Sequence, residues 1–566
     1  MARFDRRLWH RFWVLAKPYW FSDQKWHAWR LLALLIALLL GETEFSVLFN
    51  EQSGEFTSAL AAKDSTRFWH SIGVFCGILL FAVPIYGFYY FVRDKLAIHW
   101  RRWLTHHFLH RYFGHRAFYE LTAENEVDNP DQRISEDINS FTQKSLSFLF
   151  IGVSAVMQLL AFSRVLWAIS TALVLFLVVY AGLGTVVTFL VFGKPLIGLN
   201  FQQLRREADF RFSLIRVREN AESIAFYRGE GQEFSQAKRS FAELFANFNK
   251  LIRRTLSLNL FQYGYSFVTL ALPSVIIAPR VLSGELEVGR VVQAAGAFAA
   301  ILAALTVFVE NFESLSKFAA GVERLEGFAK SLRVERRQRE AGPLFERVEA
   351  SRLELTRLTL NTPKYERTLI RELSLTVEPG QNLLIVGESG GGKSSLLRAI
   401  AGLWNAGSGT IARPRLEHML FLPQHAYMIL GTLRSQLLYP GLERDVADEE
   451  LLQVLKDVNL PSVVERSGGL DVELDFSKVL SLGEQQRLAF ARVLLTKPQY
   501  AILDEASSAL DAENEEALYR KLEASSTTLV SVSHRSSVLK YHRQVLELTG
   551  GGGWRVCPAE TYTFRE

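Results

Sequence analysis

The sequence predicts two domains in one chain: a membrane α-helical bundle of six spans, followed by an α/β domain. Apolar residues make up 49% of the 566 residues, with 41 Phe and 11 Trp, and their excess lies in the first 320 residues. Beyond residue 350, short apolar runs and glycine-rich turns replace the long apolar stretches. A chain of this length is expected to hold more than one domain. We place the domains at residues 1–330 and 351–566, joined by a charged linker at 331–350.

Six apolar stretches predict the membrane spans, because most of them approach or exceed the ~20 residues that cross a bilayer as a helix. They cover residues 31–40, 68–91, 145–162, 167–192, 261–278 and 291–309. Six core helices of a soluble domain would require an implausibly large apolar core. A segment before the first stretch is typical of an interfacial helix at headgroup level. Its aromatic residues are Trp9, Phe12, Trp13, Tyr19, Trp20, Phe21, Trp26 and Trp29.

Basic residues indicate how the spans are oriented. They concentrate before the first span, between the second and third, and between the fourth and fifth, whereas the short loops near residues 50–67 and 279–290 carry few charges of mixed sign. The three groups are Arg3, Arg6, Arg7, Arg11, Lys17 and Lys25; Arg93, Lys95, Arg101, Arg102, Arg111 and Arg116; and Lys194, Arg205, Arg206, Arg211, Arg216 and Arg218. By the positive-inside rule, the N-terminus, both long loops and the C-terminal domain lie in the cytosol. The net charge of +5 then needs no nucleic-acid partner.

The location of the chain is suggested by its N-terminus. The pattern of a cleavable signal is missing, since the first apolar run begins about 30 residues into the chain. No transit peptide or eukaryotic extension is evident. We therefore expect a bacterial inner (plasma) membrane, with the C-terminal domain in the cytosol.

The sequence Gly-Glu-Ser-Gly-Gly-Gly-Lys-Ser at 387–394 fits a phosphate-binding loop, between an expected strand at 383–386 and an expected helix at 394–403. Its glycines let successive backbone N–H groups face one anion, and the helix N-terminus adds positive potential. Lys393 would reach the β- and γ-phosphates of a nucleotide, and the Ser394 hydroxyl would ligate Mg²⁺. The expected ATP contacts are Gly387, Glu388, Ser389, Gly390, Gly391, Gly392, Lys393, Ser394 and Ser395.

Acidic and histidine residues follow two further predicted strands. The apolar run at 500–505 ends in Asp504 and Glu505. Asp504 suits a Mg²⁺ contact, and Glu505 suits the general base that orients an attacking water. His534 follows a β-rich run at 527–533, where a contact to the γ-phosphate is expected. Together with the phosphate loop, these residues predict an α/β P-loop ATPase domain.

Residues 350–566 resemble an ATP-binding cassette domain in the order and spacing of their motifs. Besides the residues above, the resemblance rests on Gln424 after Phe-Leu-Pro, Leu-Ser-Leu-Gly-Glu at 480–484, and Ser-Ala-Leu-Asp ending at Asp511. It implies two cassettes packed head to tail, with each ATP held between one subunit's phosphate loop and the other subunit's 480–484 segment. Ser481, the backbone of Gly483 and the N-terminus of the helix that follows would face the γ-phosphate from across the interface, and Glu484 is counted with them among the expected ATP-binding residues.

The resemblance also assigns roles to Gln424 and Asp511. Gln424 would contact the metal and the water and connect them to the membrane domain, and Asp511 would link the two ATP sites. The expected catalytic residues are therefore Glu505, His534 and Gln424. The expected metal ligands are Ser394, Gln424 and Asp504.

The chain departs from the family pattern at two places. The usual signature is Leu-Ser-Gly-Gly-Gln, whereas this chain has Leu482 and Glu484 at its third and fifth positions. Ser481 and Gly483 are retained, so we expect function to survive. The family stacks adenine on an aromatic residue where this chain has Thr-Pro at 362–363, and the nearby Tyr365 is the candidate replacement.

Strings in the two long loops extend the resemblance to nearly the whole chain. Residues 129–138 and 221–229, with Gly-Leu-Trp at 402–404 and Gln-His-Ala-Tyr-Met at 424–428, resemble the peroxisomal fatty-acyl (ABCD-type) group and the bacterial SbmA/BacA-like transporters of peptides and vitamins. This implies a half-transporter with an exporter-type membrane fold, whose short loop helices dock on the cassettes. With one cassette per chain, a homodimer is the simplest assembly.

Three functions remain open. The first is ATP-driven transport of a bulky hydrophilic solute, a peptide or a cobalamin-like vitamin, by alternating access, with uptake as the expected direction. The second is transport of acyl-CoA, fatty acids or lipids, and the third is a membrane-tethered regulatory ATPase. Acidic residues at the ends of the first and last spans would line a hydrophilic cavity or reach the headgroups. These residues are Glu42, Glu44, Glu310 and Glu313.

Overall fold

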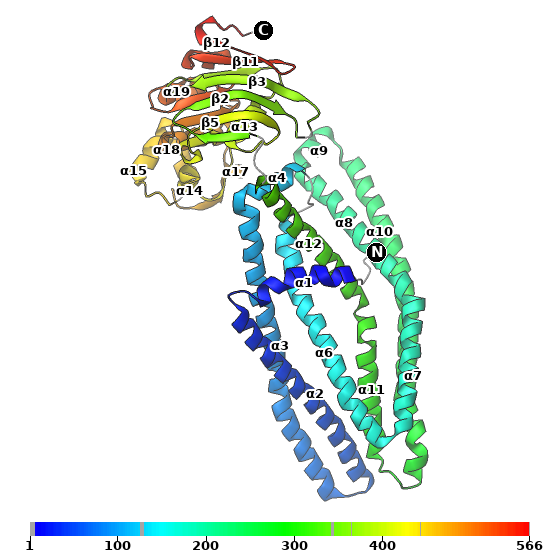
Figure 1. Cartoon of the computed structure of the whole chain (residues 1–566). Coiled ribbons are helices and arrows are strands. Elements are labelled where there is room, and N and C mark those ends of the chain that lie inside the picture. Colours follow the sequence, from blue (N-terminus) through cyan, green and yellow to red (C-terminus); the bar gives the residue numbers. More distant parts are fainter. Residues whose placement is uncertain (1–5, 125–129, 341–344, 364, 442, 565–566) are drawn as a thin grey trace. The chain divides into compact units, whose positions relative to one another are not determined.

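The computed structural model describes residues 6–124, 130–340, 345–363, 365–441 and 443–564 (Figure 1). The chain divides into two compact units, Met1–Gln338 and Arg339–Glu566. Their boundary falls inside the segment expected as a linker, 331–350. Most of that segment has regular structure, because it holds the end of helix α12 (Phe312–Glu340) and all of strand β1 (Phe345–Glu349).

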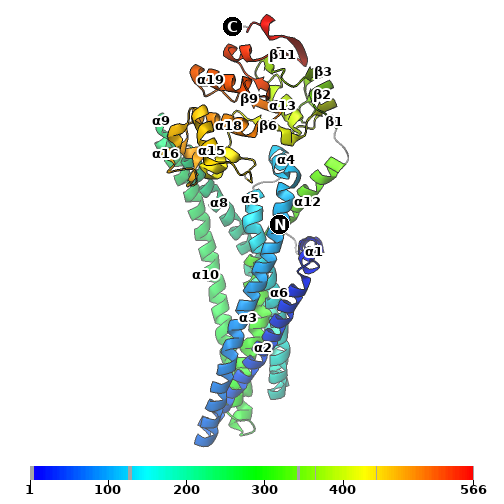
Figure 2. The same cartoon turned by 90° about the vertical axis from the view of Figure 1, so that its left-hand side faces the viewer.

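The first unit is built from α-helices, several of them much longer than a typical globular helix (Figure 2). Besides α12, they are α1 (Arg6–Trp20), α2 (Lys25–Ala61), α3 (Ser65–Phe113), α4 (Ala117–Glu124), α5 (Pro130–Gln132), α6 (Ile138–Ile169), α7 (Thr171–Val187), α8 (Lys194–Glu219), α9 (Ala221–Tyr227), α10 (Glu230–Leu282) and α11 (Gly289–Glu310). A π-helical turn, η2 (Arg133–Asp137), joins α5 to α6.

Four helical segments among the described residues are long and apolar enough to cross a membrane: Lys25–Ala61, Ser65–Phe113, Pro130–Ile169 and Gly289–Val307. They coincide with the predicted spans at 31–40, 68–91, 145–162 and 291–309. The other two predicted spans overlap shorter apolar segments, Thr171–Gly184 and Ala271–Leu282. The described residues therefore confirm a membrane domain but not the six spans.

The predicted span at 167–192 was wrong as a single helix. Ser170 adopts an extended conformation, with φ −162° and ψ 114°, which ends α6 and lets α7 begin at Thr171. Arg280 Nη1 donates to the Ile169 carbonyl at 3.0 Å, so one of the carbonyls left unpaired at the helix end is satisfied. The helix break thus has a hydrogen-bonding partner from α10.

The predicted loops at 50–67 and 279–290 are shorter than expected, because α2 continues to Ala61 and α10 to Leu282. Their turns are tied together by polar contacts. Arg67 pairs with Glu55 at 2.6 Å and with Glu287 at 2.9 Å. The Gly289 backbone N–H donates to Ser58 Oγ at 3.0 Å. The α2–α3 and α10–α11 connections therefore meet at one end of this unit, as an up-and-down arrangement of helices requires.

Helix α1 carries the aromatic segment predicted to lie at the membrane interface. Its last turn is buried in the unit, where Tyr19 stacks on Trp100 with ring centroids 5.6 Å apart and an interplanar angle of 12°. Trp9 and Trp13 stay exposed on the other side of the helix. This two-sided exposure fits a helix that packs on the bundle while presenting aromatic rings to lipid headgroups.

Asp137, in the loop string at 130–138, is a buried charge. Its side chain is 7% exposed and accepts hydrogen bonds from Arg324 Nε at 3.0 Å and Nη2 at 2.6 Å. Arg133 Nη1 adds a third bond at 3.2 Å. A buried carboxylate is tolerated when it is paired in this way. The contact with Arg324 fastens the first long loop to α12, which is the last helix before the second unit. Asn129, the first residue of the predicted loop string at 129–138, lies outside the described residues.

The second unit contains a six-stranded sheet of order β12-β11-β4-β10-β9-β6 and a four-stranded sheet of order β1-β5-β2-β3. The remaining strands are β2 (Leu353–Asn361), β3 (Thr368–Val377), β4 (Leu383–Gly387), β5 (Gly407–Arg413), β6 (Met419–Leu422), β7 (Leu430–Thr432), β8 (Glu473–Asp475), β9 (Tyr500–Asp504), β10 (Thr528–Val532), β11 (Gln544–Gly550) and β12 (Gly553–Pro558). All strands of the larger sheet run parallel except β12. The predicted strands at 383–386, 500–505 and 527–533 are confirmed.

Helices pack against these sheets and form a second layer. Helix α13 (Lys393–Ala401) follows the phosphate loop and confirms the helix predicted at 394–403. The others are α14 (Leu433–Leu438), α15 (Asp448–Asp457), α16 (Pro461–Arg466), α17 (Phe476–Val479), α18 (Leu482–Thr496) and α19 (Ala512–Glu523). Leu488 and Phe490 of α18 are buried in one hydrophobic core together with Leu503 of β9. The sheet and the helical segment at 433–496 are therefore held by a shared core.

Replacing Asp137 by asparagine should destabilise the first unit, because Arg324 and Arg133 would lose their common counter-charge. We expect a loss of about 1–3 kcal/mol, since Arg324 is half-exposed and the full cost of breaking a buried pair does not apply. The measurement is thermal unfolding of the detergent-purified chain. The control is Asp94→Asn, whose pair with Arg93 is exposed and should contribute little. Equal unfolding temperatures for the two variants would contradict the role given to Asp137.

Candidate nucleotide-binding site

The predicted site residues follow four adjacent parallel strands. Val532 of β10 lies opposite Ile385 of β4 on one side and Asp504 of β9 on the other, and Leu422 of β6 lies opposite Leu503. The segments that leave these strands are therefore at one edge of the sheet. Ligands of parallel α/β sheets bind at this carboxyl edge. The register thus gathers the phosphate loop, Glu505, His534 and Gln424.

The phosphate loop needs glycine at its two ends. Gly387 has φ +143°, and a Cβ there would lie 2.4 Å from the Leu548 carbonyl oxygen. Gly392, which caps α13, has φ +99°, and a Cβ there would lie 3.2 Å from Leu369 Cβ. Both positions are in the region that favours glycine. The loop consequently closes tightly against β11 and β3, and leads directly into the N-terminus of α13, where backbone N–H groups have no acceptor within the helix.

Lys393 is held within this loop. Its side chain is 7% exposed, and Nζ donates to the Gly387 carbonyl at 2.7 Å and to the Glu388 carbonyl at 3.0 Å. Burial lowers the pKa of Lys393, and the nearby Glu505 and Asp504 carboxylates oppose that shift. The ammonium group, the loop and the start of α13 together suit a triphosphate.

Ser394 and Asp504 form a pair suited to a magnesium ion. Ser394 Oγ donates to Asp504 Oδ1 at 3.2 Å. Burial raises the pKa of Asp504, whereas the bond from Ser394 acts in the opposite direction. Hydroxyl and carboxylate oxygens are ligands that Mg²⁺ prefers, and phosphate and water usually complete its shell. Ser394 and Asp504 supply two such oxygens; among the described residues no group of three or more His, Cys, Asp or Glu is placed to hold a metal ion.

Glu505 is the centre of a second cluster, which joins the three predicted catalytic residues. Its carboxylate accepts a hydrogen bond from Gln424 Nε2 at 3.2 Å, and His534 Nε2 lies 3.5 Å from the other oxygen. Glu505 has φ +49°, a left-handed conformation that is rare for residues other than glycine, and its N–H donates to the Val532 carbonyl at 3.0 Å. Strain of this kind is often found at functional sites. Gln424, predicted also as a metal ligand, is directed to Glu505.

The 480–484 segment forms the start of α18. Ser481 caps the helix: its Oγ accepts from the Glu484 N–H at 3.3 Å, while the Ser481 N–H donates to Glu484 Oε2 at 2.9 Å. Gly483 approaches the 508–511 segment closely, since a Cβ there would lie 3.1 Å from the Ala509 carbonyl oxygen. Ser481 and Leu482 are exposed. Within the described residues, no hydrogen bond or ion pair joins this segment to residues 387–395 of the same chain.

Sequence reasoning missed Gln486, which connects three of the predicted motifs. Its side chain is buried; Nε2 donates to the Gln424 carbonyl at 3.1 Å and to Ser508 Oγ at 3.2 Å. Its Oε1 accepts from the Ala509 N–H at 2.9 Å. Gln486 follows the 480–484 segment by two residues, but only the fold reveals its partners. It links the segments that carry Gln424, the start of α18 and the 508–511 turn.

Arg535 was also missed, although it follows His534 directly. Its Nη1 donates to the Leu510 carbonyl at 2.8 Å and its Nη2 to the Ser508 carbonyl at 2.9 Å. Asp511, predicted to link the two ATP sites, caps α19 by accepting from the Asn514 N–H at 2.8 Å. This backbone hydrogen bond and a bond from the Asn514 side chain hold the pKa of Asp511 below its usual range. The 508–511 turn is thus fixed from both sides.

Tyr365 lies in the turn between β2 and β3, with an exposed ring and φ +57°. The turn is close to the phosphate loop, because Leu369 at the start of β3 contacts the position of Gly392. The stacking of the Tyr365 ring on adenine stays a prediction.

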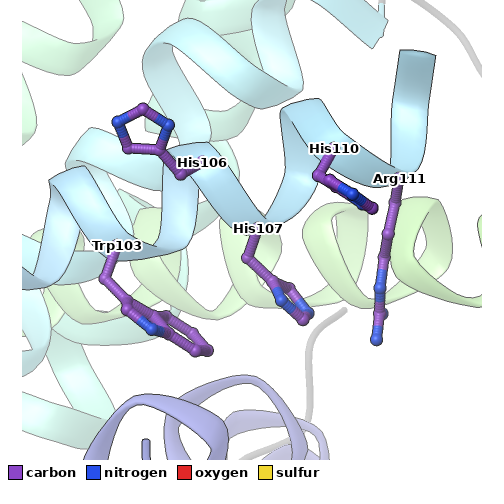
Figure 3. Close-up of a pocket in the computed structure, with 5 residues that line it drawn as sticks. All are labelled: Trp103, His106, His107, His110 and Arg111. Carbon is purple, nitrogen blue, oxygen red and sulfur yellow. The ribbon is translucent and has the colours of Figure 1, made fainter. Parts of the chain in front are cut away.

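A pocket of about 340 Å³ lies elsewhere, on α3 of the first unit (Figure 3). It is lined by Trp103, His106, His107, His110 and Arg111. The Trp103 and His107 rings stack with centroids 5.0 Å apart. No pattern in the sequence pointed to it, and all of its lining residues come from one helix.

Comparisons with known proteins agree with this geometry. Residues 15–282 match the model of ABC transporter transmembrane region 2, and residues 370–508 match the model of ABC transporter. An uncharacterized ABC transporter ATP-binding protein of Synechocystis is 45% identical, over 95% of this chain and 82% of its own length. ABC transporter D family member 2, chloroplastic, of Arabidopsis thaliana is 37% identical over 96% and 86%. The human lysosomal cobalamin transporter ABCD4 is 31% identical over 98% and 97%. The chain belongs to the ATP-binding cassette transporters, as a half-transporter with one membrane domain and one cassette.

Proposed function

We propose that this chain is an ATP-driven transporter for the uptake of a bulky hydrophilic solute, a cobalamin-like vitamin or a peptide, by alternating access. The ATPase activity in this proposal rests on one observation: Glu505 contacts both Gln424 and His534. This cluster lies beside the loop that holds Lys393. The similarity to a cobalamin transporter along nearly the whole chain supports the solute class.

Hydrolysis would use the residues of this cluster. Lys393 and the backbone N–H groups of the loop bind the phosphates of ATP. Ser394 and Asp504 would hold Mg²⁺, which neutralises charge on the phosphate oxygens. Glu505 orients a water and accepts its proton. His534 and Gln424 hold the Glu505 carboxylate in place on the γ-phosphate side of the site.

The complete site requires a second chain in this proposal. Ser481 and Leu482 are exposed, and in the part of the chain that the structure describes they make no hydrogen bond or ion pair with the phosphate loop of their own chain, which supports their use by a partner's ATP. A homodimer with two-fold symmetry supplies two such sites. Gln486 would pass closure of the site to Gln424 and to the 508–511 turn.

The membrane part of the proposal keeps six spans, with the apolar segments Thr171–Gly184 and Ala271–Leu282 as parts of the fourth and fifth. The membrane is a bacterial inner membrane with the cassette in the cytosol. Phe226 and Tyr227 at the end of α9 are exposed. Exposed aromatic rings on a loop helix support its docking on a cassette, where they would transmit closure.

Glu42 supports a hydrophilic cargo path. It is half-buried in α2, and within the described residues its Oε2 is buried without a hydrogen-bond partner. A carboxylate at membrane depth is costly unless it faces water or a polar partner. Glu44 is exposed, and the side chains of Glu310 and Glu313 lie outside the described residues. Glu42 is therefore the residue that we assign to the path.

Replacing Glu505 by glutamine should reduce ATP hydrolysis by about 100-fold or more, because the carboxylate that orients the water is lost, while ATP stays bound. Phosphate release and retained nucleotide are measured on the full-length protein in detergent. Glu417→Gln, an exposed carboxylate of the same unit, is the control and should behave as wild type. Near-normal hydrolysis by Glu505→Gln would refute the assignment.

Replacing Gln486 by leucine should lower kcat about 10-fold with little change in KM for ATP. Its side-chain hydrogen bonds within the described residues join the segments of Gln424, Ser508 and Ala509, and none of them reaches the phosphate loop. Steady-state hydrolysis over a range of ATP concentrations separates the two constants. Gln453→Leu, on the exposed side of α15, serves as the matched control. A rise in KM without loss of kcat would show that Gln486 acts on binding alone.

Reconstituted protein should hydrolyse ATP faster in the presence of cobalamin or of peptides, and Glu42→Gln should weaken that stimulation without changing the basal rate. The assay compares cobalamin, a peptide mixture and acyl-CoA on the same proteoliposomes. Stimulation by acyl-CoA alone would favour the lipid transporter. If no compound is stimulatory and no solute enters sealed vesicles, the result would favour the regulatory ATPase.

A further inference from the structure

Glu484, the fifth residue of the 480–484 segment, carries a negative charge where the γ-phosphate of a partner's ATP is expected. Glu484 Oε2 accepts from the Ser481 N–H at 2.9 Å and from the Ser481 hydroxyl at 3.1 Å. Its other oxygen is paired with Arg466 Nη2. Burial would raise the pKa of Glu484, but the bonds from Ser481 and the Arg466 guanidinium hold it below its usual range. The group is therefore a carboxylate at neutral pH.

This charge is unfavourable for the proposed shared site. The γ-phosphate of a partner's ATP is itself an anion, and like charges repel strongly where water is excluded. The glutamine that is usual at this position in the family carries no charge. A chain with Glu484 therefore needs a compensating cation close to this carboxylate.

Arg466 is placed to supply that cation. It is the last residue of α16, whose C-terminus is fixed by bonds from the Gly468 N–H to the Glu465 carbonyl at 3.1 Å and from the Gly469 N–H to the Val464 carbonyl at 2.9 Å. The Arg466 side chain is 45% exposed, whereas that of Glu484 is 16% exposed. Within the described residues Glu484 has no other ion pair.

The Ser481 hydroxyl makes this cation necessary when ATP binds. A hydroxyl has one proton to donate, and in this structure it is directed to Glu484. If Ser481 turns its proton to a γ-phosphate, Glu484 loses that donor as a new negative charge approaches. Arg466 is the remaining charged partner of Glu484 at that moment.

We propose that Arg466 is a positioning residue of the shared ATP site, which neutralises Glu484 and so lets the 480–484 segment accept the γ-phosphate from a second chain. The inference rests on the proposed function, because it requires that ATP is shared between two chains. Arg466 acts through Glu484, and the need for it disappears when the residue at 484 is neutral. That dependence separates this role from a purely structural one.

The test is a double-mutant cycle on the full-length protein in proteoliposomes. Arg466→Gln, Glu484→Gln, the double variant and wild type are compared for KM and kcat of ATP hydrolysis. Each is also combined with Glu505→Gln to measure how much ATP is needed for nucleotide trapping. We expect Arg466→Gln to raise KM about 10-fold in the Glu484 background, and to change it by about 2-fold or less in the Glu484→Gln background.

Arg466→Lys is the conservative variant, and it should keep KM within about 3-fold of wild type, because the compensating charge remains. It also keeps the test valid if Arg466→Gln does not fold, since Arg466→Lys should then still trap ATP normally. An equal increase of KM in both backgrounds, or no increase in either, would overturn the role of Arg466. Absence of hydrolysis and trapping in the wild type would instead refute the proposed function itself.

Discussion

The parallel register of β4, β10, β9 and β6 is the constraint on which the rest of the cassette depends. Residues that are far apart in sequence become neighbours only because these strands lie side by side with their carboxyl ends at one edge. The register places Asp504 beside Ser394 and places Glu505 beside Gln424 and His534. A slip of one residue would turn alternate side chains to the other face of the sheet and separate these groups.

Polar contacts that need the fold connect this edge to other segments of the second unit. Gln486 and Arg535 fix the 508–511 turn through backbone atoms, so the turn cannot move independently of Gln424 or of the segment that carries His534. In the first unit, Asp137 has the same function for the first long loop, which it fastens to α12. Such buried, paired groups favour movement of whole segments over independent motion of single loops.

Local patterns predicted the strands, the phosphate loop, Glu505 and His534, because each is a short apolar run or follows one, whereas Gln424 was predicted only through the resemblance to the cassette family. Gln486, Arg535 and Arg466 could not be predicted in this way, since their partners come from other segments. The span boundaries failed for a related reason. Polar residues near 50–58 suggested a loop, but α2 continues there because Ser58 and Gly54 pack against Gly289 of α11. The break at Ser170 interrupts an apolar stretch at a single serine, and one serine without glycine or proline beside it is a weak signal for a helix end.

The most direct test of the account is whether one ATP site is built from two chains. The experiment uses mixed dimers in which both chains carry Glu505→Gln. One chain also carries Lys393→Ala, and the other chain also carries Ser481→Asp. The Ser481→Asp substitution keeps the helix cap but adds a charge that repels the phosphate. Both defects then fall on one shared site and leave the other intact, so we predict one trapped ATP per dimer. A dimer with both substitutions in the same chain should trap almost none. The reverse pattern would show that each chain builds its own site, and would contradict the account.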